Sequence, residues 1–151
     1  MVTGSSNPVE VTPPMARPFK IRDIDHVVLR VRDLERMIEF YSRVLGCNVE
    51  WRRPDLGLVH LRAGSAMIDL VPVSGPLGSK GGAAPGKEGR NLDHVCLRVA
   101  PFDPDAIARH LESHQVRVGD IRPRFGAQGE GVSIYAYDPE GNLVELKGAA
   151  D

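Results

Sequence analysis

The hydrophobic pattern of the chain contains one strand twice. Residues 25–31, Asp-His-Val-Val-Leu-Arg-Val, recur as residues 93–99, Asp-His-Val-Cys-Leu-Arg-Val, with a single difference. In both copies alternate positions are apolar, which is the period of a β-strand with one buried face. The histidine lies on the opposite face from the alternating apolar residues. A repeat of this kind predicts two copies of one structural unit.

Each repeated strand is followed by a helical pattern and then by three strand-like runs. We expect Asp33 to cap the first helix and Gly46 to end it. We expect Asp103, followed by Pro104, to cap the second helix. The strand-like runs then cover 48–52, 58–62 and 66–71 in the first half, and 116–121, 132–137 and 143–147 in the second. Each half is therefore predicted to be a βαβββ module, and the fold class is α+β.

The same pattern predicts the organisation of the chain. Residues 1–19 have no sustained apolar periodicity and are expected to form a disordered leader. Residues 20–151 are then one domain, with module 1 over about 20–73 and module 2 over about 91–148. The Gly- and Pro-rich stretch 74–90 is the expected linker.

Composition and charge narrow the classes of partner. Nineteen Lys and Arg against twenty Asp and Glu give a formal charge of -1, so no net field attracts nucleic acid or an acidic membrane. The chain has no run of about 18 apolar residues and no secretory signal pattern. Two cysteines, Cys47 and Cys96, are too few for a disulfide framework. We expect a cytoplasmic protein that binds a small molecule, and no nucleic acid or membrane partner.

The repeat also indicates candidate metal ligands. His26 and His94 occupy the same position in the two copies. The last strand of each half carries one carboxylate in an apolar setting, Asp69 in the first and Glu145 in the second. A buried carboxylate is costly unless it is paired or binds a cation, and imidazole with carboxylate suits borderline divalent metals.

Ion pairs are the alternative interpretation of the two carboxylates. Asp69 could pair with Arg62, and Glu145 with Lys147 or Arg98 across neighbouring strands. The histidines could likewise be ordinary surface or hydrogen-bonded residues. The sequence pattern alone leaves both interpretations open.

Three motifs together resemble the vicinal oxygen chelate superfamily, which includes glyoxalases, bleomycin resistance proteins and extradiol dioxygenases. They are the repeated strand with His26, the helix containing Phe40-Tyr41 and Leu45-Gly46, and Asp-Pro-Glu-Gly-Asn-Leu-Val-Glu at 138–145. The resemblance covers 21–147 and is greatest to single-chain glyoxalase-domain proteins. It implies paired modules that form a curved, cup-shaped mixed sheet with the helices outside.

The resemblance also implies the site. His26, His94 and Glu145 would hold one Zn, Ni, Co, Mn or Fe ion, with Asp69 at a fourth position where glyoxalase I has the longer glutamate. Short chains of this type commonly form homodimers in which the metal site is shared between chains.

The function that follows is a glyoxalase-type, lyase- or isomerase-like proton transfer on a small substrate with vicinal oxygens, through a metal-bound enediolate. Glu145 and Asp69 are the candidate catalytic carboxylates. The candidate substrate-binding residues on the neighbouring strands are Tyr135, His60, Ser133 and Arg124. The alternatives are a solvent-facing His60, a packed edge aromatic for Tyr135, and a solvated edge charge for Arg124.

Two other functions fit the same resemblance. An extradiol-type Fe(II) dioxygenase needs two histidines and one carboxylate, which His26, His94 and Glu145 provide. A non-enzymatic antibiotic-binding resistance protein is the second alternative. Such proteins have usually lost the metal ligands, and an aromatic content of 5% with one tryptophan leaves few surfaces on which a flat drug could stack.

Overall fold

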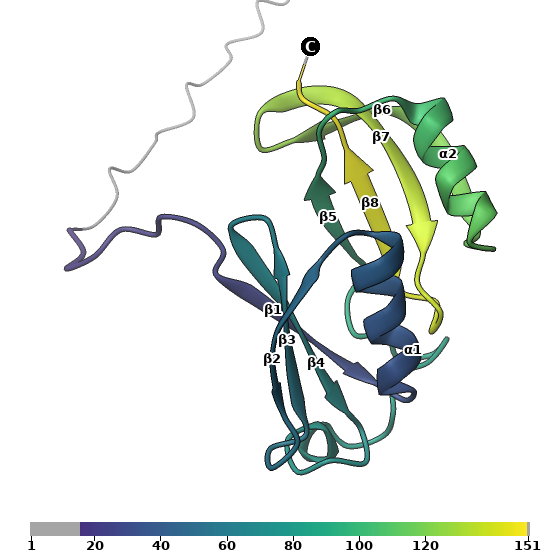
Figure 1. Cartoon of the computed structure of the whole chain (residues 1–151). Helices are drawn as coiled ribbons and strands as arrows, with labels where there is room; N and C mark the ends of the chain where they lie inside the picture. The colour runs from purple at the N-terminus through teal and green to yellow at the C-terminus, as the bar shows by residue number, and fades with distance from the viewer. Residues whose placement is uncertain (1–15, 151) are drawn as a thin grey trace, which may run out of the picture.

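The computed structural model of the protein describes residues 16–150. The chain forms two successive βαβββ modules, each with its own sheet and helix (Figure 1). Module 1 contains β1 (His26–Val31), α1 (Leu34–Glu39), the π-helical turn η1 (Phe40–Val44), β2 (Asn48–Arg53), β3 (Leu58–Ala63) and β4 (Ala66–Pro72). Module 2 contains β5 (His94–Arg98), α2 (Pro104–Ser113), β6 (Val118–Gly126), β7 (Gly129–Tyr137) and β8 (Leu143–Lys147). The predicted α+β class and paired modules are confirmed.

The helices begin and end where the local sequence requires. The Asp33 carboxylate accepts a hydrogen bond from the Arg36 amide at 3.1 Å, and the Asp103 carboxylate accepts one from the Ala106 amide at 3.1 Å. Both predicted N-caps are therefore confirmed. Gly46 follows η1 with a φ of 86°, a conformation that glycine adopts at little cost.

Each module forms a separate four-stranded mixed sheet. The strand orders are β1-β4-β3-β2 and β5-β8-β7-β6, with the first and last strands of each module parallel. In the second sheet Glu145 pairs in register with Cys96 on β5 and Tyr135 on β7. In the first sheet Asp69 pairs with Val28 and His60 in the same way. The two carboxylates thus occupy equivalent central positions, one in each sheet.

The predicted strand bounds are least accurate in the second module. The sequence pattern predicts that the run at 116–121 ends well before 132, with a glycine-rich loop between. In the structure β6 and β7 continue to Gly126 and Gly129 and pair along this whole stretch. The glycines therefore belong to a long hairpin whose tip is residues 127–128.

The connection between the modules is held by one arginine. Residues 74–90 include the short 3-10 helix η2 (Gly78–Gly81) and pass beside β1. The guanidinium group of Arg30 donates to four carbonyl oxygens of this connection, those of Gly78, Gly81, Gly82 and Ala83. Of the predicted leader, 1–15 lies outside the described residues, and 16–19 has no regular secondary structure.

A single hydrophobic cluster joins the two modules. It combines the helix-facing sides of both sheets with the inner faces of α1, η1 and α2. Its fully buried members include Leu29, Val31, Leu111, Ile134 and Val144. The candidate metal ligands lie on the opposite faces of the sheets. No helix within 16–150 has the length and apolar character needed to cross a bilayer.

A buried hydrogen-bond network also joins the modules. The Tyr41 hydroxyl of η1 donates to the Asp138 carboxylate at 2.8 Å. Asp138 begins the turn between β7 and β8 and also accepts from the amides of Glu140 and Asn142 and from the Asn142 side chain. Burial, and then the nearby Asp138 charge, raise the pKa of the Tyr41 phenol well above its usual value. The phenol is therefore neutral over the physiological pH range.

Replacing Tyr41 tests the strength of this connection. Tyr41→Phe removes one donor from a buried carboxylate, so the free energy of unfolding should fall by about 1–3 kcal/mol at pH 7. Because the folded state holds the phenol neutral, the wild-type advantage should shrink as the pH rises above about 10. Urea denaturation at several pH values measures both effects. Tyr137→Phe is the matched control, because it removes a tyrosine hydroxyl outside the Asp138 network and keeps the ring that Arg117 contacts. An equal loss in both variants would contradict the assignment.

Candidate metal centre

The predicted site residues lie on the faces of the two sheets that point away from the helices. We call His26, His60 and Asp69 the N-terminal half-site, and His94, Tyr135 and Glu145 the C-terminal half-site. Each half-site combines a histidine at the start of the repeated strand with a carboxylate on the parallel neighbouring strand. The half-sites belong to different sheets, so one chain does not bring all the predicted ligands together.

Both histidines of the repeated strand are oriented by the residue before them. The His26 Nδ1 lies 2.6 Å from the Asp25 carboxylate, and the His94 Nδ1 lies 2.6 Å from the Asp93 carboxylate. An ionised carboxylate can only accept, so Nδ1 carries the hydrogen and Nε2 is left with the lone pair that binds a metal. The hydrogen bond with Asp25 also raises the pKa of His26. The aspartates are part of the repeat, so the sequence itself contains this signal.

In the C-terminal half-site, Glu145 is buried and hydrogen-bonded. One carboxylate oxygen accepts from the Ser133 hydroxyl at 2.9 Å, and the other lies 3.9 Å from His94 Nε2. Burial opposes ionisation, but hydrogen bonds from Cys96 and Ser133 outweigh it and hold the pKa of Glu145 below its usual value. Two atoms bound to one ion at about 2.0–2.2 Å lie at most about 4.3 Å apart. His94 and Glu145 are therefore spaced closely enough to share an ion.

Cys96 is a site residue that the sequence reasoning did not identify. It lies two positions after His94 on β5, beside Glu145, and its thiol faces that carboxylate. Burial, and then Glu145, raise the pKa of the thiol to about 12, so it stays protonated near neutral pH. Strand alternation places it on the His94 face, which is a usable signal. Both cysteines of the chain are free.

Arg124 and Ser133 form the support beneath Glu145. The Arg124 guanidinium donates to the Ser133 hydroxyl at 2.8 Å and lies 3.6 Å from the centre of the Tyr135 ring. Ser133 is fully buried, and Arg124 is largely so, so neither is an edge charge or a surface hydroxyl. Tyr135 lies on the half-site face, with its ring centre 6.4 Å from that of His94.

The alternative ion pairs of Glu145 are not formed. The Lys147 ammonium donates to the carbonyl oxygens of Arg124 and Gly131, which fixes the β6–β7 hairpin to β8. Arg98 donates to the Gly148 carbonyl oxygen at 2.7 Å. The predicted pairing of Glu145 with Lys147 or Arg98 is therefore wrong.

In the N-terminal half-site, Asp69 holds a histidine. The Asp69 carboxylate is buried and accepts from His60 Nδ1 at 2.9 Å. The His60 ring stacks on Trp51 with ring centres 6.0 Å apart, and only 22% of its side chain is exposed. A solvent-facing His60 is therefore wrong. The predicted Asp69–Arg62 pair is wrong as well, because Arg62 pairs with Glu50 at 3.3 Å.

The imidazole and carboxylate groups of the half-sites are suitable ligands for a divalent metal. Within one chain, however, they do not lie close enough together to form a complete metal site. Within 16–150, no three His, Cys, Asp or Glu side chains lie close enough together to hold one ion. His94 and Glu145 form a pair of potential ligands, and His26 is a third, isolated in the other sheet. The described residues of a single chain therefore do not assemble the predicted set of ligands.

Comparison with known proteins relates this arrangement to a family. The chain is 30% identical over 138 residues to the glyoxalase domain-containing protein RDO1 of Mycosarcoma maydis, covering 89% of this chain and 73% of that protein. It is 29% identical over 139 residues to the mitochondrial methylmalonyl-CoA epimerase of Mus musculus, covering 87% and 75%.

The virulence protein STM3117 of Salmonella typhimurium is similar in both sequence and structure. It is 32% identical over 125 residues, covering 82% of this chain and 81% of that protein. Its crystal structure superposes with a TM-score of 0.71 and 27% identity, covering 87% of this chain and 100% of that one. Residues 23–146 match the family model itself. The chain therefore belongs to the Glyoxalase/Bleomycin resistance protein/Dioxygenase superfamily.

Proposed function

We propose that this protein is a divalent-metal-dependent enzyme of the glyoxalase type, with an active site shared between the two chains of a homodimer. The observation that carries this proposal is the division of the donors into two half-sites. Each half-site has a histidine whose Nδ1 is held by a carboxylate and whose Nε2 remains available. Side chains arranged in this way are prepared to bind a metal, yet residues 16–150 of one chain bring no third ligand to His94 and Glu145.

In the proposed dimer, His26 of one chain meets His94 and Glu145 of the other. Imidazole and carboxylate ligands suit Zn, Ni, Co, Mn or Fe. A bound divalent ion would stabilise negative charge on two neighbouring oxygens of the substrate. Twofold symmetry then gives two equivalent sites for each dimer.

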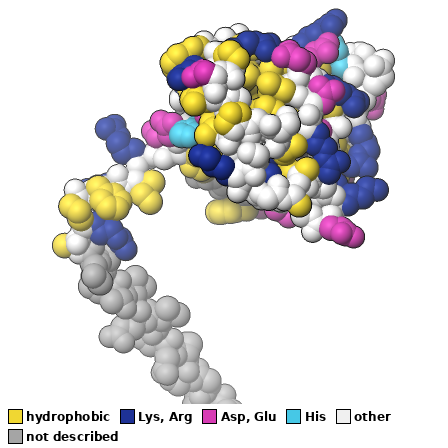
Figure 2. Space-filling model, turned by 90° about the horizontal axis from the view of Figure 1, so that it is seen from below, with side chains coloured by type: hydrophobic (Ala, Val, Ile, Leu, Met, Phe, Trp, Pro, Cys, Tyr) yellow, Lys and Arg dark blue, Asp and Glu magenta, His cyan; other side chains and the backbone are white. Residues whose placement is uncertain are grey.

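Exposed apolar side chains support the proposal that a second copy of this chain is the partner. Phe19 and Ile21, on the segment before β1, are 65% and 87% exposed. Figure 2 shows this segment leading away from the body with apolar side chains along it. Val28 and Trp51, on the first sheet, are exposed as well. Another chain that covered these side chains would remove their apolar surface from water.

We assign the proton transfer to the His60–Asp69 pair. Asp69 is one methylene shorter than the glutamate of glyoxalase I, and one of its oxygens already accepts from His60. Asp69 therefore orients His60 through Nδ1, and His60 Nε2 would remove and return a proton next to the substrate oxygens. Tyr135 contacts the substrate beside His94. Ser133 and Arg124 act by positioning Glu145.

The epimerase relative supports proton transfer in preference to oxygen chemistry. Inversion of a stereocentre beside a carbonyl group proceeds by removal and return of a proton. The mitochondrial methylmalonyl-CoA epimerase of Mus musculus is named for such an inversion and matches most of this chain. The half-buried His60, held by the buried Asp69, provides a base for this reaction. We therefore place an isomerase-like reaction ahead of a dioxygenase or a binding protein.

Mixed dimers provide a specific test of the shared site. His26→Ala and Glu145→Ala each remove a ligand, so either variant alone should lose divalent metal. A mixed dimer would contain one intact site, because His26 of one chain meets Glu145 of the other. After the two variants are refolded together, random pairing should restore about one quarter of the wild-type metal content. Titration with Zn²⁺ or Ni²⁺ against a competing chelator measures this fraction, relative to wild type refolded in the same way.

The matched control uses two variants of the same half-site. No dimer formed from His94→Ala and Glu145→Ala chains contains a complete site, so this mixture should recover no metal. Equal recovery in both mixtures would contradict the shared site. A wild-type protein that binds metal while sedimenting as a monomer would contradict it too.

Exchange of a carbon-bound proton tests the reaction class. The metal-loaded protein in D₂O should incorporate deuterium into methylmalonyl-CoA or dihydroxyacetone, two probes with an acidic C–H beside oxygens, as followed by NMR. His60→Asn should slow this exchange by about 100-fold or more, because a positioned base contributes that much. The metal content should not change. Ring cleavage of catechol by the Fe(II)-loaded protein, without proton exchange, would establish the dioxygenase instead.

The support beneath Glu145 can be tested separately. Ser133→Ala removes the hydroxyl that donates to the carboxylate, so the pKa of Glu145 should rise and the free energy of unfolding should fall by about 1–3 kcal/mol at pH 7. NMR titration of the side-chain carboxyl carbon measures the pKa, and urea denaturation measures the stability. Ser42→Ala is the control, because Ser42 donates to a helix carbonyl far from Glu145. An unchanged Glu145 pKa in Ser133→Ala would show that the hydroxyl does not hold the carboxylate.

A further inference from the structure

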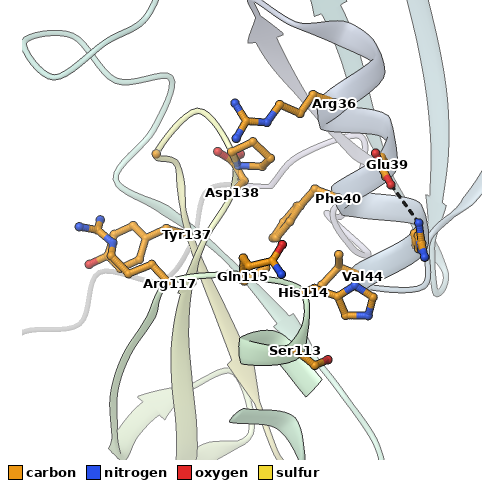
Figure 3. A pocket seen from close by; sticks show the side chains of 14 residues that line it. Arg36, Glu39, Phe40, Val44, Ser113, His114, Gln115, Arg117, Tyr137 and Asp138 are labelled. Atoms are coloured by element: carbon orange, nitrogen blue, oxygen red, sulfur yellow. Dashed lines mark hydrogen bonds and ion pairs between the residues drawn. The ribbon is translucent and has the colours of Figure 1, made fainter. Parts of the chain in front are cut away.

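A second candidate binding site lies on the helix side of the molecule, apart from both half-sites. It is an open cleft of about 690 Å³, which is within the usual range for small-molecule pockets. Figure 3 shows α1 on one side of the cleft, and on the other the segment that joins α2 to β6 together with the end of β7. None of the proposed metal ligands lines it.

The cleft presents positive charge that the chain does not neutralise. The guanidinium groups of Arg36 on α1 and Arg117 before β6 both line it, and neither has a carboxylate within 4.0 Å among residues 16–150. Arg117 is held in place by stacking on the Tyr137 ring, 3.7 Å from its centre. Arg43, by contrast, is paired with Glu39 at 3.2 Å. Two arginines are thus available for an anion, and guanidinium groups bind carboxylate and phosphate with paired hydrogen bonds.

The acidic residue in the floor of the cleft does not compete for these arginines. Both oxygens of the Asp138 carboxylate are used by donors from Tyr41, Glu140 and Asn142. The side chain is also buried, so it faces the network and not the open volume. The exposed positive groups therefore dominate the mouth of the cleft.

The cleft also has an apolar wall and a fixed polar group. The apolar residues Phe40 and Val44 of η1, together with Val116 before β6, line it. Between them Gln115 has a φ of 56°, which makes it the one non-glycine residue within 16–150 with a positive φ. The Gln115 amide donates to the Glu112 carbonyl oxygen and the Val116 amide donates to that of Leu111, so Gln115 is the left-handed residue that ends α2. This cap fixes the backbone of Gln115, and Gln115 lines the cleft.

We propose that this cleft binds a small organic anion, a carboxylate or phosphate monoester with an apolar body. The anionic group lies between Arg36 and Arg117, and the apolar body rests on Phe40, Val44 and Val116. Gln115 provides one neutral donor or acceptor to the ligand. The ligand would contact α1 of module 1 together with the α2–β6 connection of module 2, and so bridge the two modules. This site is independent of the proposed metal centre.

Binding of phenyl phosphate to the full-length protein tests this inference. Isothermal titration should give saturable binding, and amide NMR signals of Gln115 and Arg117 should shift on titration. Arg36→Gln and Arg117→Gln should each weaken binding by about tenfold or more, because each removes charge-assisted hydrogen bonds. Arg109→Gln, which changes an exposed arginine of α2 outside the cleft, should leave the affinity unchanged.

Two further measurements refine this test. One asks whether Gln115 contacts the ligand or has only a structural role, and the other asks whether the ligand binds in the cleft or elsewhere. Gln115→Gly relieves the backbone strain, so it should raise the melting temperature while weakening phenyl phosphate binding; a purely structural role would change the melting temperature alone. Inorganic phosphate should bind more weakly than phenyl phosphate, and equal affinity would overturn the role of the apolar wall. Shifts confined to His94 and its neighbours, or no saturable binding up to about 10 mM, would overturn the cleft itself. Neither result depends on whether the protein binds metal.

Discussion

The fold depends on how a few buried carboxylates are supplied with hydrogen-bond donors. Asp138 is the central case, because it is buried at the junction of the two modules and has four hydrogen-bond donors. An ionised carboxylate in such a position is costly unless its oxygens are satisfied. The Tyr41 hydroxyl therefore holds η1 against the β7–β8 turn. β8, which carries Glu145, begins directly after that turn, so the junction and the candidate site share one anchor.

The same requirement explains the form of the two half-sites. Asp69 and Glu145 are both buried at the centre of a sheet, and each receives donors from the neighbouring antiparallel strand: His60 in one sheet and Ser133 in the other. The modules thus repeat the carboxylate and the strand histidine but differ in the group that satisfies the carboxylate. Imidazole can exchange protons near neutral pH, whereas a serine hydroxyl cannot. The repeat consequently yields two chemically different halves, one with an imidazole and one with a hydroxyl beside the buried carboxylate.

The sequence predicts the features of this structure that depend on local patterns, and it does not predict those that depend on contacts between distant segments. Strand alternation, the caps at Asp33 and Asp103 and the repeated histidine are local patterns, and the structure contains the elements they predict. The Asp69–His60 pair depends on strand register, which the pattern within one strand does not contain. The β6–β7 hairpin has the sequence pattern of a loop, because its glycines are equally compatible with a turn. The repeat predicts two equivalent modules but does not indicate which of their faces pack together. The separation of the two half-sites within one chain therefore cannot be predicted from it.

That separation has a thermodynamic consequence for the proposed enzyme. If each metal ion joins two chains, metal affinity and dimer affinity are linked, and whatever stabilises one must stabilise the other. The cleft beside α1 lies on the opposite side of the same junction, where Asp138 contributes to both its floor and the turn before β8. An anion bound there could alter metal binding only if its affinity differs between the metal-bound and metal-free states. The Asp138 turn is the element through which such a difference would act, because it is in contact with η1 and leads directly into the strand of Glu145.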